Sequence, residues 1–263
     1  MDDRPRVGII GGSGWLGGAI AHRLIETGVS SPERLTVSFR SSKPARFQGA
    51  YWTKDNQTLA DRSDVIVVSV RPEDWPSVAI SANGKLAISV MAGIRLHELA
   101  DGLGTRRVIR SLPNAAAEVG KSYTPWVASA DLTDRDRVIA REIFDACGNA
   151  DEVGTEAEID YLTGLAGSGP AFPALLAAAM MKDAEAHGFG RDMARRVATS
   201  VLIGAGRLLE LHDECPRNTV ETFVAYRGTT AAAIEAMRAN GFDSAVSEGL
   251  AAALRKSVSM RQC

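Results

Sequence analysis

Three glycines near the start of the chain, Gly12, Gly14 and Gly17, have the spacing GxGxxG. The apolar segment 7–10 precedes them, and an apolar helical pattern follows over residues 19–25. A strand, a glycine-rich turn and a helix in this order form the fingerprint of a dinucleotide-binding site. We expect Gly12 to permit a tight turn, Gly14 to let the backbone approach a pyrophosphate, and Gly17 to let the helix pack against the strand. A glycine-rich turn that serves only a tight bend is the alternative.

A polar segment follows the second expected strand, residues 35–38. In a dinucleotide-binding fold this segment meets the adenosine ribose, about 20 residues beyond the glycines, and sites selective for NAD place Asp or Glu there. This chain instead offers Arg40, Ser41, Ser42 and Lys43. These side chains suit the 2′-phosphate of NADP through charge and hydrogen bonding. The sequence therefore favours NADP over NAD, and a solvated basic loop is the alternative.

Histidine and cysteine residues show no spacing typical of a metal site. The histidines are His22, His97, His187 and His212, and the cysteines are Cys147, Cys215 and Cys263. An odd number of widely separated cysteines forms neither a disulfide framework nor a CxxC pair. Cys147 lies in an apolar helical pattern and is expected to be a small core residue. The sequence therefore predicts no metal site.

Strands that alternate with helices organise the first half of the chain. Further strands are expected at residues 64–70, 86–93, 107–114 and 122–129. The run 64–70 is almost continuously apolar, which is typical of a parallel strand buried on both faces. A helix then follows, with Thr133 as its N-cap, Asp136 in its first turn and Gly148 as its end. This order predicts an α/β fold with a doubly wound, mostly parallel sheet.

Composition and charge narrow the class of protein. The 263 residues are 45% hydrophobic and 24% charged, and the formal net charge is -2. This composition is that of a soluble globular protein, and the charge gives no electrostatic support for binding nucleic acid or an anionic membrane. No continuous apolar run reaches the roughly 18 residues of a membrane span. The charged start of the chain, residues 2–6, is followed by no signal-peptide core, so we expect a cytoplasmic protein.

The second half of the chain changes to long, alanine-rich helical patterns from about residue 155. Apolar residues recur at helical spacing over residues 172–180 and 246–258. The apolar faces are wide for a domain of this size, so we expect a dimer interface formed by helices. A self-contained helical bundle is the alternative.

Several segments spread over nearly the whole chain form a combined pattern. They are residues 10–20, 55–56, 64–72, 89–94, 107–110, 113–114, 167–171 and 228–230. The Gly-Ser-Gly-Pro-Ala segment at 167–171 and the Gly-Thr-Thr segment at 228–230, in this order after a nucleotide-binding half, are the most specific. This pattern resembles the pyrroline-5-carboxylate reductases of proline biosynthesis.

The resemblance implies a fold and a reaction. The fold would be an N-terminal Rossmann-type domain, residues 1–155, followed by an all-α dimerisation and substrate domain, residues 156–263. The reaction would be the reduction of a cyclic imine, 1-pyrroline-5-carboxylate, to proline by NAD(P)H, and the basic segment at residues 40–43 favours NADPH over NADH. The partners would be this small imine and a second copy of the chain bound through the C-terminal helices, in a dimer or a higher oligomer, with no nucleic acid and no membrane.

The resemblance also implies roles for individual residues. Gly12, Gly14, Trp15, Leu16 and Gly17 would hold the pyrophosphate. Arg40, Ser41 and Asn56 would surround the adenosine ribose and its phosphate. Val70, Arg71, Pro72, Ala92 and Gly93 would lie along the nicotinamide side. Asn114 would belong to the substrate pocket, and Gly228, Thr229 and Thr230 would form the substrate-binding turn.

The residues of that turn give a physical reason for this role. Thr229 and Thr230 precede the apolar helical stretch 231–237, so we expect them at a helix N-terminus, where N–H groups and the helix dipole favour a carboxylate. A threonine hydroxyl there can also donate toward a ring nitrogen, which makes Thr229 the candidate catalytic residue. Plain N-capping is the alternative, and both roles can hold at once.

Two departures from the family pattern bear on the substrate. The family usually has Ser-Pro-Gly before its Gly-Thr-Thr, whereas this chain has Ala-Tyr-Arg at residues 225–227. Its Pro-Asn is usually followed by Thr-Pro, whereas this chain has Ala-Ala at residues 115–116. An arginine in place of glycine changes volume, backbone freedom and charge together. Arg227 would pair with a substrate carboxylate, occupy the pocket and exclude the usual substrate, or point to solvent.

Three functions therefore compete. The first is a pyrroline-5-carboxylate reductase. The second is a related NADP-dependent reductase of another imine or of a carbonyl compound, which the altered residues 225–227 favour. The third is a catalytically silent NADP-binding dimer. A comparison of NADPH binding with turnover would separate the third function from the first two, and a panel of substrates would separate the first from the second.

Overall fold

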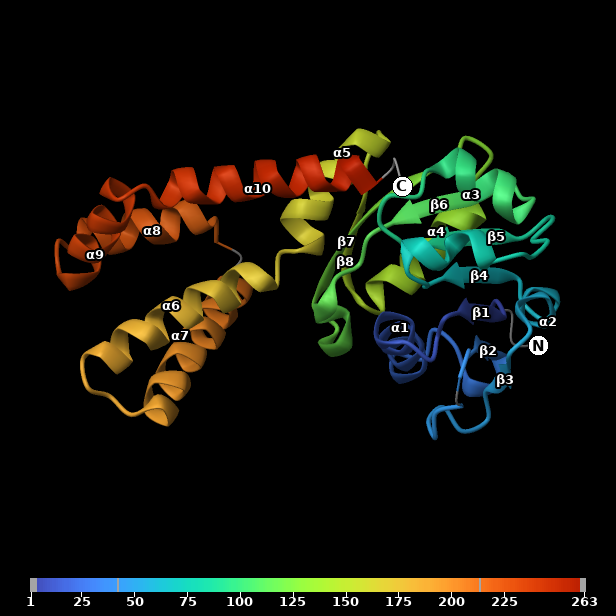
Figure 1. The fold of residues 1–263 in the computed structure, drawn as a ribbon, viewed down its shortest axis with the longest axis horizontal. Helices are drawn as coiled ribbons and strands as arrows, with labels where there is room; N and C mark the ends of the chain where they lie inside the picture. The colour runs from blue at the N-terminus through green and yellow to red at the C-terminus, as the bar shows by residue number, and fades with distance from the viewer. Residues whose placement is uncertain (1–3, 42, 213, 261–263) are drawn as a thin grey trace. The chain divides into compact units, whose positions relative to one another are not determined.

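The computed structural model describes residues 4–41, 43–212 and 214–260. Its strands are β1 (Val7–Ile10), β2 (Leu35–Ser38), β3 (Tyr51–Thr53), β4 (Val65–Val68), β5 (Leu86–Ser89), β6 (Val108–Ser111), β7 (Ser122–Ala128) and β8 (Gly148–Glu152). They form one sheet in the order β3-β2-β1-β4-β5-β6-β7-β8 (Figure 1). Neighbouring strands run parallel except β6 and β7, which are antiparallel. This order confirms the predicted Rossmann-type, mostly parallel sheet.

Helices connect the strands and form the rest of the chain. Those within the first 162 residues are α1 (Trp15–Glu26), α2 (Asn56–Asp61), α3 (Leu96–Leu103), α4 (Asp134–Asp145) and α5 (Glu156–Leu162). The later ones are α6 (Ala171–Ala186), α7 (Arg191–His212), α8 (Pro216–Ala225), α9 (Thr229–Ala239) and α10 (Phe242–Ser259). Short helical turns are η1 (Pro32–Arg34), η2 (Pro72–Ser77), η3 (Ala115–Val119) and η4 (Thr163–Gly167). The change from alternating elements to helices confirms the predicted fold class.

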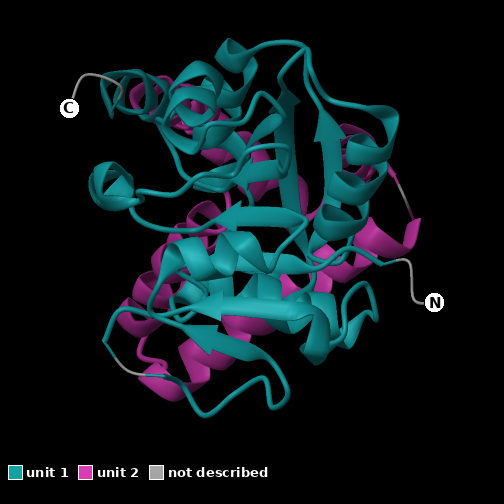
Figure 2. Cartoon of the chain, turned by 90° about the vertical axis from the view of Figure 1, so that its right-hand side faces the viewer, with its two compact units in different colours: residues 1–168, 253–263 teal, residues 169–252 magenta. Residues whose placement is uncertain are grey.

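The chain forms two compact units (Figure 2). Unit 1 comprises residues 1–168 and 253–263, and unit 2 comprises residues 169–252. These bounds differ from the predicted domains, 1–155 and 156–263. The reason is that α5 and η4 pack on β7, so the first helices after the sheet belong with the sheet. The last residues of α10 also count with unit 1.

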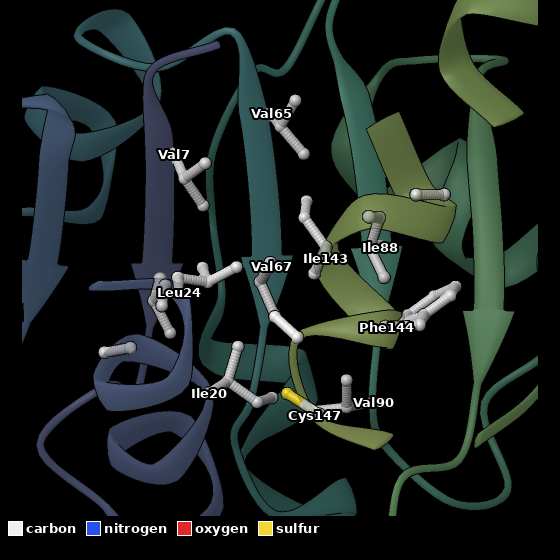
Figure 3. Close-up of a cluster of buried hydrophobic side chains, with 14 of the residues drawn as sticks. Val7, Ile20, Leu24, Val65, Val67, Ile88, Val90, Ile143, Phe144 and Cys147 are labelled. Carbon is white, nitrogen blue, oxygen red and sulfur yellow. The ribbon is translucent and has the colours of Figure 1, made fainter. Parts of the chain in front are cut away.

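The core of unit 1 lies on both faces of the sheet, because successive residues of a strand point to opposite faces. Val65 and Val67 of β4 pack with α1 and α4 in one buried cluster, part of which Figure 3 shows. Ile66 of the same strand belongs to a second cluster that contains residues of α2 and α3. Cys147 is buried in the first cluster, as predicted, and burial raises the pKa of its thiol to about 11.

The sequence did not predict two of the strands, β3 and β8. Strand β3 has three residues and none is fully buried, and β8 buries only Ala150 among five. Both lie at an edge of the sheet, where little apolar burial is needed, so their sequences carry no apolar run. Gly148 is also not the end of a helix as predicted. Helix α4 ends at Asp145, and Gly148 begins β8 with a φ of 145°, where an added Cβ would lie 2.1 Å from Ser122 O.

Helix α4 begins as predicted. Thr133 is its N-cap, and a capping box joins Thr133 to Asp136. The Asp136 carboxylate is fully buried and also accepts hydrogen bonds from the Arg107 guanidinium, the one from Nε at 2.9 Å. Burial alone would raise the pKa of this carboxyl, but the hydrogen bonds from Arg107 and Thr133 outweigh it and the pKa is lowered. A charged carboxylate thus joins α4 to Arg107, the residue before β6.

This carboxylate is expected to make stability depend on pH. Because the pKa of Asp136 is lower in the folded chain than in the unfolded chain (about 3.9), its contribution is complete at neutral pH and is lost as the pH falls below about 4. We predict that Asp136→Asn lowers the free energy of unfolding at pH 7 by about 2 kcal/mol. Denaturant melts at neutral and acidic pH measure this effect. A difference between variant and wild type that is as large at acidic pH as at pH 7 would contradict the prediction.

Unit 2 is a set of helices with little buried surface of its own. Helix α6 packs on α7, and α8 on α9. Large apolar side chains on these helices remain exposed, among them Leu175, Ile203 and Leu211. The fully buried side chains described in α6 to α9 are three alanines, Ala194, Ala198 and Ala231. Within the described residues, unit 2 therefore lacks a core of large apolar side chains.

One helical stretch, residues 156–186, has the length and composition of a membrane span, with a mean hydropathy of 1.3. Charged residues, glycine and serine interrupt this stretch, so it holds no continuous apolar run of membrane-span length and the sequence pattern did not reveal it. A single such helix is weak evidence for a membrane, since length and composition are its whole support.

Candidate active site

The glycine turn joins β1 to α1, and its left-handed residue is Gly11. Gly11 has a φ of 76°, and an added Cβ there would lie 2.3 Å from Ser69 O. Gly12, which the sequence predicts to permit the tight turn, donates its N–H to Ile9 O at 3.3 Å, and an added Cβ there would lie 3.2 Å from the same oxygen. Gly12 is glycine because an added Cβ would lie 2.5 Å from Val37 Cγ1 of β2. Gly11 thus adds a requirement for glycine that the GxGxxG pattern does not include.

Gly14 and Gly17 have the surroundings expected for cofactor binding. Gly14 is the N-cap of α1, and an added Cβ there would meet Gly11 O alone, at 3.1 Å. This open side gives a phosphate room to approach the backbone. An added Cβ on Gly17 would lie 2.9 Å from Gly12 Cα, so glycine permits close packing of the helix against the turn. Trp15 and Leu16 are the first residues of α1, and Trp15 Nε1 donates to Glu118 Oε2 at 3.1 Å.

The end of β2 is bonded to the glycine turn. Gly11 N donates to Ser38 Oγ at 3.0 Å, and Ser13 N donates to Ser38 O at 3.3 Å. The basic segment that begins with Arg40 therefore leaves the sheet beside this turn. The side chain of Arg40 is 83% exposed, and its Nη1 lies 3.1 Å from Asp74 Oδ1 of η2. Ser41 and Lys43 are exposed, and Ser42 lies outside the described residues.

The remaining cofactor candidates follow neighbouring strands. Val70, Arg71 and Pro72 follow β4, Ala92 and Gly93 follow β5, and Asn56 begins α2 after β3. Because β1, β2, β4 and β5 are parallel, their carboxyl ends lie at one edge of the sheet, together with the glycine turn. Gly93 has a φ of 83°, and an added Cβ would lie 3.4 Å from Met260 Cβ. Met260 thus lies beside these carboxyl ends within unit 1.

Asn114 has an internal role that the sequence did not indicate. Its Nδ2 donates to Ala166 O at 2.9 Å, and its Oδ1 accepts from Ala116 N at 2.9 Å. Its backbone N donates to Ser122 Oγ at 2.9 Å. The side chain caps η3 and ties it to η4. Asn114 therefore orders the segment after β6, and its predicted part in the substrate pocket stays a prediction.

The turn before α9 combines a strained residue with exposed hydroxyls. Arg227 has a φ of 53°, in the left-handed region that favours glycine. Gly228 is the N-cap of α9 and makes no side-chain cap bond, and Thr229 and Thr230 are the first helical residues. The alternative that a threonine is the N-cap is therefore wrong. All four residues are exposed, so the hydroxyls stand beside the N–H groups of the first turn.

A buried ion cluster holds α5 to the sheet. Arg110 of β6 lies 2.8 Å from Asp160 Oδ1 and 3.1 Å from Glu156 Oε1. Arg110 and Asp160 are each 1% exposed. Burial lowers the pKa of Arg110, although the hydrogen bond to Glu156 opposes this effect. Leu96 N also donates to Glu156 Oε1 at 3.1 Å, so the cluster joins β6, α3 and α5.

Three residues near the glycine turn were missed by sequence reasoning. They are Arg46, which donates to carbonyl groups of the turn, Asp74, which pairs with Arg40, and Glu118, which accepts from Trp15. Each lies in a loop or a short helical turn. Such segments lack the regular spacing that, in helices and strands, predicts which side chains face the same side. A polar residue with such a partner is visible only once the chain is folded.

Comparison with known proteins places this arrangement in a family. Residues 156–260 match the family model for pyrroline-5-carboxylate reductase dimerisation, and residues 6–93 match the model named NADP oxidoreductase coenzyme F420-dependent. The pyrroline-5-carboxylate reductase of Synechocystis sp. is 33% identical over 260 residues, which cover 96% of this chain and 97% of that protein. The chain belongs to the pyrroline-5-carboxylate reductase family. The resemblance found in the sequence is thereby confirmed, and the chain is an oxidoreductase acting on a CH–NH bond.

Solved structures agree with this assignment. A pyrroline-5-carboxylate reductase from Coxiella burnetii is 27% identical and superposes with a TM-score of 0.88 over 98% of this chain and 99% of that chain. A pyrroline carboxylate reductase from Plasmodium falciparum with NADP bound is 23% identical, with a TM-score of 0.82 over 98% and 99% of the two chains, and shows the shared fold. The matched NADP oxidoreductase model supports NADP as the cofactor.

Proposed function

We propose that this chain reduces the C=N bond of 1-pyrroline-5-carboxylate to give proline, with NADPH preferred over NADH. Two features of this chain together support the proposal. The first is a glycine turn whose Gly14 is open to a diphosphate. The second is a helix, α9, that begins with two exposed threonines and no side-chain cap.

The residues at the carboxyl ends of the parallel strands fit a dinucleotide. The open backbone at Gly14 and the first N–H groups of α1 would hold the pyrophosphate, and Arg40 with Ser41 would hold the ribose phosphate. The small residues Ala92 and Gly93 would leave room for a flat ring. When bound, NADPH supplies the hydride for the imine carbon. The protein supplies orientation and exclusion of water.

The turn before α9 fits the other end of the reaction. The N–H groups at the start of an 11-residue helix favour the substrate carboxylate. The Thr229 hydroxyl would donate a hydrogen bond to the ring nitrogen, and water would replace the proton that the nitrogen takes up. One hydride on carbon and one proton on nitrogen convert the imine to the amine of proline.

Replacement of Thr229 tests this role. Thr229→Val keeps the shape of the side chain and removes the hydroxyl, so we predict a decrease in kcat/KM of about tenfold, the value of one neutral hydrogen bond. Thr230→Val is the matched control at the next position of the same helix, with a smaller expected effect. Steady-state kinetics with pyrroline-5-carboxylate measure both variants. Unchanged kcat and KM for Thr229→Val would remove the proposed role.

Arg40 and Asp74 give a paired test of cofactor preference. We predict that Arg40→Ala raises KM for NADPH about tenfold and leaves KM for NADH unchanged, because only NADPH carries the 2′-phosphate. Asp74→Asn removes the carboxylate that pairs with Arg40 in the structure and is expected to lower KM for NADPH. Equal effects of Arg40→Ala on NADPH and NADH would contradict the preference.

The activity itself is tested by following NADPH consumption by the purified protein. The assay uses pyrroline-5-carboxylate, other cyclic imines and controls without an imine. Turnover on pyrroline-5-carboxylate supports the proposal. Binding of NADPH without turnover on any imine would overturn it in favour of a silent binding protein.

A second candidate function is the reduction of a different imine or of a carbonyl compound. The observation that favours it is Arg227, which stands where the family usually has glycine and adopts a backbone conformation suited to glycine. In the same substrate panel, turnover on another imine together with none on pyrroline-5-carboxylate would select this candidate.

Assembly as a homodimer through the C-terminal helices, with higher oligomers built from it, is also proposed. The match of residues 156–260 to the dimerisation model and the exposed apolar side chains of unit 2 support it. A partner helix would cover the apolar residues that give the stretch 156–186 its high hydropathy, so we propose no membrane partner. The net charge of -2 gives no support for a nucleic-acid partner, and none is proposed. The proposed location is the cytoplasm. Light scattering of the purified protein measures the mass, and a monomer would contradict the dimer.

A further inference from the structure

Arg46 lies against the glycine turn and binds its carbonyl groups. Its Nη2 donates to Gly12 O at 3.2 Å, to Ser13 O at 2.9 Å and to Gly14 O at 3.2 Å. One guanidinium nitrogen thus contacts consecutive carbonyl groups of the turn that joins β1 to α1. Hydrogen bonds from a charged donor are among the stronger ones in proteins.

Gly18 makes room for this guanidinium. An added Cβ on Gly18 would lie 2.4 Å from Arg46 Nη2 and 2.7 Å from Arg46 Cζ. Gly18 lies inside α1, where glycine is less favourable than alanine by about 1 kcal/mol. The GxGxxG pattern does not require a glycine at this position. The space that Arg46 needs gives a physical reason for it.

The chain around Arg46 is shaped to direct it to the turn. Phe47, the next residue, has a left-handed backbone with a φ of 57°, which is uncommon for a bulky side chain. Its ring stacks on Trp52 with ring centroids 6.0 Å apart, and the Arg46 guanidinium lies 5.2 Å from the same ring. Strain of this kind persists where the surrounding structure holds it, often at ligand sites.

The bonds from Arg46 fix the peptide planes of the turn. In each trans peptide the C=O and the following N–H point in opposite directions, so three carbonyl groups held toward Arg46 leave three N–H groups on the other side. Two of these already have acceptors, because Ser13 N donates to Ser38 O of β2 and Gly14 N donates to Gly11 O within the turn. The third belongs to Trp15, the first residue of α1, where donors for a phosphate are expected.

We propose that Arg46 is a positioning residue for the dinucleotide, which holds the glycine turn in its phosphate-binding conformation before the cofactor arrives. This inference rests on the proposed function, since it concerns the same NADPH site. A turn ordered in advance loses less conformational freedom on binding, so Arg46 increases affinity without touching the cofactor. Gly18 takes part only by leaving room for the guanidinium.

The test uses Arg46→Met, Gly18→Ala and the double variant, with NADPH binding measured by fluorescence titration and Tm measured without cofactor. We expect each single variant to raise the Kd for NADPH about tenfold. Gly18→Ala should do so while its Tm stays the same or rises, because alanine favours the helix. Since both changes remove the same contact, the double variant should bind NADPH no more weakly than either single variant.

Two controls separate this contact from general effects. Arg62→Met removes a guanidinium that packs on Tyr51 at 3.9 Å and should leave the Kd for NADPH unchanged. Arg46→Lys keeps the positive charge and places three donors on one nitrogen, so it should recover part of the affinity. Wild-type affinity in Gly18→Ala, or effects of the two changes that multiply in the double variant, would overturn the inference. Binding is measured apart from turnover, so a wild type that binds NADPH without reducing the imine overturns the proposed function alone.

Discussion

Arg110→Met is expected to lower the free energy of unfolding by about 4 kcal/mol, because it removes the guanidinium that balances the buried Asp160 carboxylate. Arg110 and Asp160 are both 1% exposed, and their closest nitrogen and oxygen are 2.8 Å apart. The charges cannot be solvated where they lie, so the loss of one costs more than the pair contributes as a whole. Denaturant unfolding at neutral pH measures the change.

The control for this prediction removes both charges of the pair. Arg110→Met combined with Asp160→Leu replaces it with apolar side chains, which is often nearly neutral for stability. We expect the double variant to recover part of the lost stability, although Glu156, 3.1 Å from Arg110, remains. A loss below about 1 kcal/mol for Arg110→Met alone, the usual range of a surface pair, would show that the cluster is solvated in solution.

The parts of the fold that bury a continuous apolar run could be predicted from the sequence. Strand β4 is buried at every residue, and its valines and isoleucine stand out as a parallel strand. The helix after Thr133 was found at its first turn because a capping box has a local signature. Edge strands such as β8 could not be found, since their partners lie on one side only and their side chains remain polar and exposed.

Part of the candidate site could likewise be predicted from the sequence, and part could not. The glycine turn could be located because backbone approach needs glycine at fixed spacing, yet the reason for each glycine came from residues far away in the sequence. Gly12 depends on Val37, and Gly18 depends on Arg46. The partner of Arg40 is Asp74, 34 residues away. Contacts between loops follow no regular spacing in the sequence. The sequence therefore revealed the residues expected to bind the cofactor, but not the residues that hold them in place.

For the turn before α9, the sequence revealed the unusual residue and the structure revealed its backbone conformation. The sequence showed that arginine replaces the family's glycine at position 227, and the structure adds that the backbone keeps the left-handed conformation, with a φ of 53°. This conformation costs a residue other than glycine about 1–3 kcal/mol. The Arg227 backbone N–H donates to Val224 O at 3.1 Å, but among the described residues its guanidinium makes no hydrogen bond or ion pair that would offset this cost. The conformation therefore favours a role of the guanidinium in binding.

Arg227→Gly should therefore change stability and substrate affinity in opposite directions. Glycine relieves the backbone strain, so Tm is expected to stay the same or rise. The guanidinium is lost, and if it pairs with the substrate carboxylate through two hydrogen bonds, KM for pyrroline-5-carboxylate should rise about fiftyfold with little change in kcat. Thermal melts and steady-state kinetics on the same preparation give both values.

Arg227→Asn is the matched control, because asparagine tolerates the left-handed region and carries no charge. It should raise KM as Arg227→Gly does, which assigns the effect to the guanidinium rather than to the freedom of the backbone. A decrease in KM for both variants would mean that Arg227 occupies the pocket and excludes this substrate. The sign of the change in KM thus decides whether Arg227 pairs with the substrate or excludes it, and an unchanged KM would mean that Arg227 points to solvent, the third possibility that the sequence left open.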